Sequence, residues 1–407
     1  MSSTIEHGQE MRPLSSVAFV DQTGKLGGAE LSLLDLIRSR EGKKRAIIFE
    51  DGPFVNELRR MDVDTQVCLL GDRAAAVRKQ SGTLGKIYAV RDLLNHQRRL
   101  QKALHGFDVV YANTPKALVT SAIASGRKAG KLIYHLHDIL SASHFSSLNR
   151  KLLVTLTNFY ADCVIANSDA TAAAFKSAGG RSSLVSVVPN GFDLLAFSKA
   201  IERASDYRQA IRNVENIGMN VPVVAVVGRV AAWKGQHVAI DAIARTPNAH
   251  LWIVGDALFG EDKEYMTSLL RQVKELGLIE RVNFMGQRTD VLPILQAADV
   301  IVHCSISPEP FGRVIVEAML SRRPIVASRA GGAMEIIEDG KTGRLTQPGN
   351  VQELVDCICS LVGDSSEKSR MVDAAQKSAS ERYGLNVVAD KINQIIDNVA
   401  CVQRAKV

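Results

Sequence analysis

Short, continuously apolar runs alternate with longer stretches in which apolar residues recur at helical spacing, through both halves of the chain. Because polar residues do not alternate within the runs, the pattern is typical of parallel strands that helices cover on both faces. Strand–helix alternation over this length predicts a doubly wound α/β sheet, and here it predicts two. The predicted strands are residues 17–20, 46–49, 66–70, 108–112, 131–135, 163–166 and 184–189 in the first half, and 223–227, 251–254, 282–285, 299–303 and 324–328 in the second.

A Pro-Asn-Gly turn at residues 189–191 separates the two sets of strands, and a polar helical stretch follows it as far as Asn220. A chain of 407 residues is also too long for one ordinary core and suits two domains of roughly 200 residues each. We therefore expect a flexible N-terminus at 1–14, a Rossmann-like domain at 15–195, a linker region at 196–220, a second Rossmann-like domain at 221–385 and an amphipathic C-terminal helix at 386–407.

The composition is that of a soluble globular protein, with 46% hydrophobic and 23% charged residues. The longest apolar runs fall well short of the ~18 residues that span a bilayer. The polar N-terminus lacks the basic-then-apolar order of a signal peptide. We therefore expect the protein in the cytoplasm, or at the inner face of the membrane as a peripheral protein. The six cysteines include no C-x-x-C pair, which favours reduced thiols over disulfides or a zinc site.

The net charge of +7 is concentrated in the first half of the chain. The excess peaks at residues 72–102, which hold eight basic residues and two acidic ones, and where apolar residues recur at helical spacing. This pattern fits either a solvated basic helix face or an interfacial helix that contacts anionic lipid or a lipid-linked phosphate. Nucleic acid is disfavoured as a partner, because no aromatic residues interleave with the arginines to stack on bases.

Ligands of open α/β sheets bind beyond the carboxyl ends of the strands, so residues just after predicted strands are the candidates for chemistry. Gly27 and Gly28 follow the first strand and precede a helix, where they permit close backbone approach and an anion at the helix start. A tight turn without a ligand is the alternative. The loop is neither a G-x-G-x-x-G dinucleotide loop nor a P-loop. His137 follows the strand at 131–135 and can serve a substrate hydroxyl, or be a structural histidine.

Two cations follow the first strand of the second half. Arg229 comes directly after the run V-V-A-V-V-G, and Lys234 closes the stretch R-V-A-A-W-K. Arginine can grip phosphate oxygens bidentately and lysine adds a point charge, so a diphosphate could be held between them. Surface cations are common, and the pair alone is a moderate signal.

The run from Asp299 to Glu317 is the most informative part of the sequence. A buried strand ends in a polar loop, P-E-P-F-G-R, and a helical pattern starts near Arg313. Glu309 lies in the loop and Glu317 lies inside the helix, on the order of 10 Å further along. Backbone N–H groups at the helix start can bind a phosphate, so the two carboxylates could bracket a nucleotide sugar. The alternative, two solvated carboxylates, is disfavoured by the flanking Pro, Phe and Gly.

This run closely resembles the acidic motif of family-4 glycosyltransferases, the retaining enzymes of GT-B fold also described as glycosyl transferases group 1. The resemblance extends over about residues 15–385 and includes G-G-A-E, H-D, P-N-G-F-D, G-R-x-x-x-x-K-G and E-P-F-G-x-x-x-x-E, followed by G-G-A-M-E and D-G-K-T-G. Each motif is weak alone, and their order and spacing are specific. The resemblance implies two Rossmann-like domains that face each other across a cleft.

The resemblance also implies a role for each candidate residue. Glu317 would bind the ribose hydroxyls, Glu309 would bind hydroxyls of the transferred sugar, and His137 would lie near its reacting face. Arg229 and Lys234 would hold the diphosphate and stabilise the leaving charge. The expected donor-binding set comprises Gly27, Gly28, Arg229, Lys234, Glu309, Phe311, Gly312, Arg313, Val314 and Glu317, and the expected catalytic set comprises His137, Arg229, Lys234 and Glu309.

The implied reaction is hexosyl transfer from a UDP- or GDP-sugar to a hydroxyl acceptor, with retained anomeric configuration and no cofactor. The basic first half favours a saccharide or lipid-linked acceptor used in envelope polysaccharide or glycolipid synthesis. Asp62 and Asp64 form a D-x-D sequence like a metal site of the GT-A fold, but it precedes a strand, so we interpret it as a polar turn and expect metal independence. The family often has glycine near Asp62 and proline near Met334, and these departures loosen the prediction of the donor.

Two other functions remain open on the sequence. A nucleotide-sugar epimerase of the same fold would convert a UDP-sugar without an acceptor. A non-catalytic nucleotide-sugar-binding subunit would be expected to have lost Arg229, Lys234 or Glu309, and this chain has all three. An NAD-binding module is weaker, for want of the glycine fingerprint.

Overall fold

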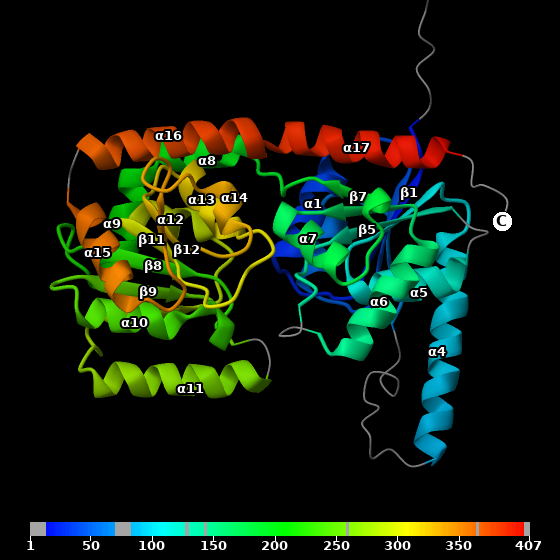
Figure 1. The fold of residues 1–407 in the computed structure, drawn as a ribbon, viewed down its shortest axis with the longest axis horizontal. Helices are drawn as coiled ribbons and strands as arrows, with labels where there is room; N and C mark the ends of the chain where they lie inside the picture. The colour runs from blue at the N-terminus through cyan, green and yellow to red at the C-terminus, as the bar shows by residue number, and fades with distance from the viewer. Residues whose placement is uncertain are drawn as a thin grey trace, which may run out of the picture. The chain divides into compact units, whose positions relative to one another are not determined.

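The computed structural model describes residues 14–69, 83–126, 130–141, 145–257, 260–363 and 366–402, and residues 83–90 by their backbone alone. Two parallel sheets with helices between their strands form the fold, as the apolar runs predict (Figure 1). Elements up to the last strand of the first sheet are β1 Val17–Asp21, α1 Gly28–Ser39, β2 Lys44–Ile48, α2 Pro53–Arg60, β3 Thr65–Val67, α4 Thr83–Leu104, β4 Val109–Ala112, α5 Pro115–Ser125, β5 Lys131–Leu136, α6 Ser147–Tyr160, β6 Cys163–Ala166, α7 Asp169–Ser177, the 3-10 turn Ser182–Leu184 and β7 Val185–Val187.

The second half begins with two helices and then repeats the alternation. Its elements are α8 Leu194–Glu202, α9 Ala204–Val214, β8 Val223–Val227, the 3-10 turn Ala232–Lys234, α10 Gln236–Ala244, β9 His250–Val254, α11 Gly260–Glu275, β10 Val282–Gly286, α12 Val291–Ala297, β11 Val300–His303, α13 Arg313–Leu320, β12 Ile325–Ser328, α14 Ala333–Ile336, β13 Arg344–Thr346, α15 Val351–Val362, α16 Ser366–Tyr383 and α17 Leu385–Cys401.

The order of the strands creates a switch point in each sheet. The first sheet runs β3-β2-β1-β4-β5-β6-β7 and the second runs β10-β9-β8-β11-β12-β13. The order reverses between β1 and β4 and again between β8 and β11. Open α/β sheets bind their ligands beyond the strand ends at such a reversal. A strand is present at each of the twelve predicted places, although β3 ends at Val67, before the predicted end at residue 70, which lies outside the described residues. The edge strand β13 was not predicted, because its three residues include a charged arginine and form no apolar run.

Both faces of the second sheet are buried, which explains its continuous apolar runs. In β8, Val223 and Ala225 point into one core while Val224 and Val226 point into another. Side chains of α12, α13 and α16 fill the first core, and those of α10, α11 and α15 fill the second. Figure 1 shows α10 and α11 on the side of this sheet opposite α16. A strand covered on two faces needs apolar residues at every position.

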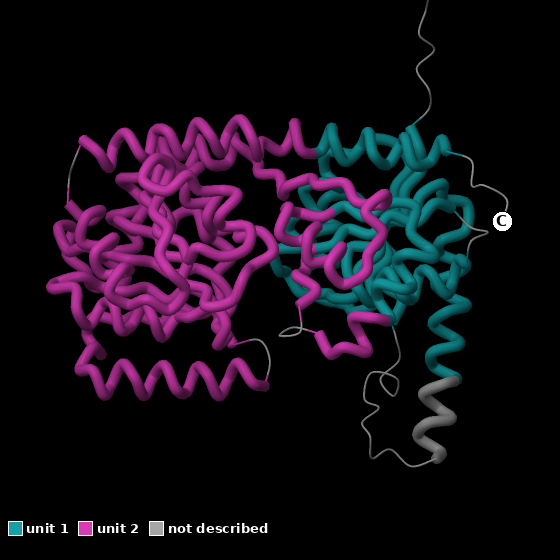
Figure 2. Tube along the Cα trace, in the orientation of Figure 1, with its two compact units in different colours: residues 1–136, 152–165, 389–407 teal, residues 137–151, 166–388 magenta. Residues whose placement is uncertain are grey.

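The chain divides into two compact units that are not contiguous in sequence (Figure 2). Unit 1 comprises residues 1–136, 152–165 and 389–407, and unit 2 comprises residues 137–151 and 166–388. The domain boundaries expected from the sequence remain predictions. The C-terminal helix predicted at 386–407 corresponds to α17, which spans 385–401.

The Asp62–Asp64 sequence forms a turn after α2. Asp62 has a φ of 55°, in the left-handed region, and its backbone N–H donates to the carbonyl of Arg59 over 3.0 Å. Asp64 forms an ion pair with Arg45 at 2.7 Å. The left-handed conformation gives a physical reason why glycine suits position 62, because glycine adopts it without a steric cost.

The basic stretch at 72–102 lies partly outside the described residues. Its second part is in α4, where the side chains of Leu93 and Leu94 are exposed along with those of Arg91 and Arg98. Contact of this helix with a membrane stays a prediction. Within the described ranges, no helix combines the length and the hydropathy that crossing a bilayer requires.

Helix α17 is fastened within unit 1 by a buried arginine. Arg40 is 2% exposed, and its guanidinium donates to the Asn393 side chain at 3.0 Å, the Ser15 carbonyl at 2.7 Å and Asp397 Oδ1 at 2.8 Å. These contacts join the start of β1 to residues nearly 400 positions later. They also place one buried positive charge against one partly exposed carboxylate.

Asp397→Asn is expected to lower the free energy of unfolding by about 2 kcal/mol at pH 7, because it leaves the Arg40 charge buried without its counter-ion. The contacts with Arg40 and Ser15 outweigh burial and hold the pKa of Asp397 below its usual value. The ion pair therefore stabilises the fold above the unfolded-state pKa of about 3.9 and loses its effect as the pH falls toward the folded-state pKa. Urea unfolding of both proteins at several pH values measures this. A difference that stays constant down to pH 3 would contradict it.

Candidate functional site

The loop after β8 lies against the end of β11, the neighbouring strand at the switch point of the second sheet. Gly235 makes this approach possible: it has a φ of 71°, and a Cβ there would lie 2.1 Å from the Cys304 carbonyl oxygen. Ile306 N–H also donates to the carbonyl of Trp233, over 2.9 Å. The close packing brings the side chain of Lys234 to the loop that follows β11.

Glu309 lies at the centre of a buried polar cluster in that loop. Its carboxylate accepts from Lys234 Nζ at 2.7 Å through both oxygens. Oε1 also accepts from Ser305 Oγ and lies 2.7 Å from His303 Nε2. Glu309 is 6% exposed and Ser305 is 1% exposed. The structure therefore brings together two predicted residues, Lys234 and Glu309, and two that were not predicted.

The electrostatics keep the Glu309 carboxylate ionised. Burial alone would raise its pKa, but the charges and hydrogen bonds of His303 and Lys234 outweigh burial and hold the pKa well below the usual range. A fixed, desolvated negative charge is available at this strand end at every physiological pH. Such a group can accept a hydrogen bond from a ligand hydroxyl but cannot donate one.

Helix α13 begins as predicted, directly after Gly312. Gly312 has a φ of 92°, in the left-handed region that glycine favours, and is the N-cap of the helix. Phe311 is buried, stacking on Phe192 with ring centroids 6.5 Å apart and meeting Tyr383 edge-on at 5.6 Å. The aromatic contacts anchor the backbone of the loop just before the N–H groups of the first turn.

Helix α13 carries three more of the predicted residues: Arg313, Val314 and Glu317. The Arg313 guanidinium lies over the Phe192 ring, 4.5 Å from its centroid, and its Nε lies 3.6 Å from Glu317 Oε1. Val314 is buried. Burial raises the pKa of Glu317, and the nearby Arg313 offsets this in part. Glu309 and Glu317 thus have separate partners and opposite pKa shifts.

The G-G-A-M-E motif at residues 331–335 packs against the Glu309 loop. Gly331 and Glu309 form a parallel bridge, and Gly332 N–H donates to the Glu309 carbonyl over 2.9 Å. A Cβ on Gly331 would lie 2.3 Å from that carbonyl oxygen, and one on Gly332 would lie 2.7 Å from backbone atoms of Phe311. The two glycines are needed for close packing. Met334, in the position where the family often has proline, is exposed.

Glu335 of the same motif caps α7. Its carboxylate accepts from the backbone N–H groups of Asp169 and Ala170, at 2.8 and 2.7 Å. Ser168, the N-cap of α7, donates its hydroxyl to the Pro310 carbonyl. Helix α7 is therefore hydrogen-bonded both to the Glu309 loop and to the G-G-A-M-E segment.

Arg229 and His137 have environments of their own. Arg229 Nε lies 3.8 Å from Asp262 Oδ2, and its guanidinium lies 5.6 Å from the Trp233 ring centroid. Lys234 Nζ lies 4.6 Å from the centroid of the same ring. His137 follows β5 directly. Burial, together with the charge of Arg313, lowers the pKa of its imidazole to about 3, so it is neutral at physiological pH.

The Gly27–Gly28 loop belongs to unit 1, whereas the residues above belong to unit 2. Gly27 is the N-cap of α1, and its N–H donates to the Glu30 carboxylate over 2.9 Å. At the switch point of the first sheet, Asn113 Nδ2 donates to Asp21 Oδ2 at 2.7 Å and to the Ala29 carbonyl at 3.3 Å. Burial raises the pKa of Asp21 to about 6. Hydrogen bonds within unit 1 therefore hold this loop in place.

Comparison with known proteins identifies the family. A model described as glycosyl transferases group 1 matches residues 207–378, and one described as Glycosyltransferase Family 4 matches residues 54–194. Anabaena HepE, solved in complex with UDP-glucose, is 38% identical with a TM-score of 0.84, and the alignment covers 94% of this chain and 100% of HepE. The chain belongs to the group 1 glycosyltransferases.

Other glycosyltransferases match parts of the chain or its fold. The lipopolysaccharide core biosynthesis glycosyltransferase LpsE of Rhizobium meliloti is 32% identical over 177 residues, which cover 44% of this chain and 50% of LpsE. The chain spans about half the length of the curated relatives it matches. WaaG, at 17% identity and a TM-score of 0.68, shares the fold. The two-sheet architecture is the GT-B fold, as predicted.

Within this group 1 glycosyltransferase, sequence reasoning missed four residues of the site: Ser168, His303, Ser305 and Glu335. His303 is the last residue of a strand at a switch point, and that position was the available signal. The partners of Ser168 and Glu335 lie more than 130 residues away, and only the fold brings them together.

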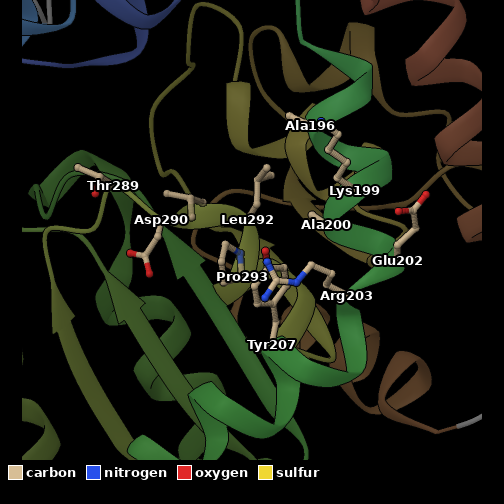
Figure 3. A pocket seen from close by; sticks show the side chains of 11 residues that line it. Ala196, Lys199, Ala200, Glu202, Arg203, Tyr207, Thr289, Asp290, Leu292 and Pro293 are labelled. Atoms are coloured by element: carbon tan, nitrogen blue, oxygen red, sulfur yellow. The ribbon is translucent and has the colours of Figure 1, made fainter. Parts of the chain in front are cut away.

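The glycosyltransferase also has a surface hollow outside the predicted site, with a volume of about 440 Å³. It lies where α8, α9 and the start of α12 meet, and Figure 3 shows Lys199, Arg203 and Tyr207 at its wall. Arg203 stacks on Tyr207 at 4.8 Å, and Asp290 pairs with Arg288 at 2.6 Å. No predicted donor-binding residue lines it.

Proposed function

We propose that this protein is a retaining glycosyltransferase that moves a hexosyl group from a UDP- or GDP-sugar to a hydroxyl acceptor. The observation that carries the proposal is the buried, ionised Glu309 paired with Lys234 at the switch point of the second sheet. Family membership supports it, and so does the presence of UDP-glucose in the related HepE structure.

Different side chains of this site would contact different parts of the donor. Lys234 and Arg229 would hold the diphosphate and stabilise the charge that develops as the sugar leaves. Glu309 would accept from a hydroxyl of the transferred sugar, and Glu317 would accept from the ribose. The N–H groups at the start of α13 would face a phosphate oxygen. His137, which is neutral, would lie near the reacting face of the sugar.

The proposed reaction needs no nucleophile from the protein. The departing phosphate would help to remove the proton of the acceptor hydroxyl, so the new glycosidic bond forms on the face from which the diphosphate leaves. This keeps the anomeric configuration of the donor. We propose no metal in the site. The described residues contain no group of three or more His, Cys, Asp or Glu side chains arranged to hold one, and metal independence stays a prediction.

The acceptor is proposed to be a saccharide or lipid-linked saccharide used in envelope polysaccharide or glycolipid synthesis. The basic excess of the first half and the exposed Leu93 and Leu94 of α4 favour an anionic or lipid-bearing acceptor. The name of the relative LpsE points to the same class. We propose a cytoplasmic location, with peripheral contact at the inner face of the membrane.

Incubation with UDP- and GDP-hexoses plus soluble and lipid-linked acceptors tests the proposal, with NMR of the product to read the anomeric configuration. The expected result is transfer with retention that a chelator leaves unchanged. A folded protein that neither transfers nor hydrolyses any donor would refute the function. Conversion of the UDP-sugar without an acceptor would indicate an epimerase. Loss of activity with chelator and its return with manganese would overturn metal independence.

A further inference from the structure

His303 is a buried histidine in a position that packing alone does not explain. It is the last residue of β11, between the buried side chains of Val302 and Cys304, and it is 5% exposed. Its Nδ1 is buried and has no hydrogen-bond partner among the described residues. An apolar side chain of similar volume would fill the space without burying an unsatisfied polar atom, so the imidazole opposes stability at this point.

The other ring nitrogen of His303 faces Glu309. Nε2 lies 2.7 Å from Oε1, and Oε1 also accepts from Ser305 and Lys234. Oε2 has one contact among the described residues, with Lys234 Nζ. A carboxylate oxygen accepts about two hydrogen bonds in its lone-pair directions. Oε1 is thus saturated, and the remaining acceptor capacity of Glu309 lies on Oε2.

We propose that His303, together with Ser305, is a positioning residue that fixes the rotation of the Glu309 carboxylate and leaves Oε2 for a hydroxyl of the donor sugar. This proposal rests on the proposed function. Lys234 alone cannot set the rotation, because its ammonium group lies at equal distances from both oxygens. The close contact of His303 Nε2 and the hydrogen bond from Ser305 are both on Oε1, and they remove that symmetry. A Cβ on Gly312 would lie 3.7 Å from Nε2. The start of α13 therefore lies next to the imidazole ring of His303.

Two substitutions separate positioning from folding. His303→Leu removes both nitrogens and keeps the volume, and His303→Gln keeps an N–H donor near the place of Nε2. His303→Leu is expected to melt at or above the wild-type temperature, because no polar atom is left unsatisfied. Its kcat/KM with UDP-glucose is expected to fall at least tenfold, while its Kd for UDP, which has no sugar, stays within twofold of wild type. His303→Gln is expected to recover most of the loss, and Ser305→Ala to show a smaller loss of the same kind.

The readouts also distinguish the possible failures. If His303→Leu keeps kcat/KM within twofold in an active enzyme, the positioning role is wrong and the proposed function stands. If UDP and UDP-glucose binding weaken equally and the melting temperature drops, the histidine is structural and the proposal is overturned. If the wild-type protein binds and uses no nucleotide sugar, the proposed function fails and the positioning role fails with it.

Discussion

Lys234→Met is expected to reduce glycosyl transfer by about 10³-fold, the largest loss that we predict for a single side chain. Lys234 Nζ is the only ammonium group within 2.7 Å of Glu309 in the described site, and it would also face the diphosphate. Removing one fixed donor from a developing negative charge costs about 10²–10³ in kcat. The loss of donor orientation by Glu309 adds to this. Steady-state rates with saturating donor measure the effect.

The matched control for this variant is Lys199→Met, in the wall of the hollow shown in Figure 3. Lys199 is exposed and lies outside the predicted site, so its variant is expected to keep wild-type activity. Lys234→Arg should retain more activity than Lys234→Met because it keeps the charge, although its planar fork fits the site differently. A Lys234→Met protein with more than a tenth of wild-type activity would contradict the electrostatic role.

The pH dependence of Lys234→Met follows from the same contacts. Lys234 is one of the two charged or polar groups that hold the pKa of Glu309 down against the effect of burial. Without Lys234, less opposes the effect of burial, and the pKa of Glu309 rises. The residual activity should therefore fall on the acid side of neutrality, where the wild-type protein keeps Glu309 ionised.

Gly331→Ala is expected to lower the free energy of unfolding by about 3 kcal/mol and to abolish donor binding, because it would push the Glu309 loop away. The new Cβ would lie 2.3 Å from the Glu309 carbonyl oxygen, and the φ of +58° is unfavourable for alanine. Calorimetry and a thermal-shift titration with UDP-glucose measure the two effects.

Gly340→Ala is the matched control for the glycine substitution. Gly340 has a φ of +76°, so alanine meets the same backbone strain, but no atom lies within 4 Å of the new Cβ. It is expected to cost about 1 kcal/mol and to leave donor binding intact. If both variants lose stability and donor binding to the same extent, close packing against Glu309 is not the reason that glycine is required at position 331.

The fold was predictable because its signal is local. The central strands lie in short, mostly apolar runs that can be seen in the sequence, such as V-A-F-V in β1 and V-V-A-V-V in β8, whereas the unpredicted β13 is a three-residue edge strand. The glycine at the start of α13 was predictable for the same reason, since the Pro-Phe-Gly sequence marks a break before a helix. The predicted turn at Asp62–Asp64 also needed no long-range information.

The site residues that could be predicted are those that lie within a recognisable sequence motif. Glu309 and Glu317 appear as a pair in sequence, yet their partners differ: Lys234, 75 residues earlier, for Glu309, and Arg313 on the same helix for Glu317. No periodicity links His303 to Glu309 as a hydrogen-bonding pair, because the contact depends on the path of the loop. The sequence gives no sign of the role of Glu335, because a carboxylate in a helical segment is usually solvated.

The buried Arg40 has a consequence for the order in which the chain can be completed. Its partners Asn393 and Asp397 belong to α17 and lie 353 and 357 residues after it, so a ribosome adds them long after Arg40. Residues 15–136 leave the ribosome long before their own counter-ion exists, so unit 1 cannot reach its final state until α17 has been made. A gene fragment that ends after the first sheet should yield an insoluble product, and supplying α17 as a separate peptide should rescue it.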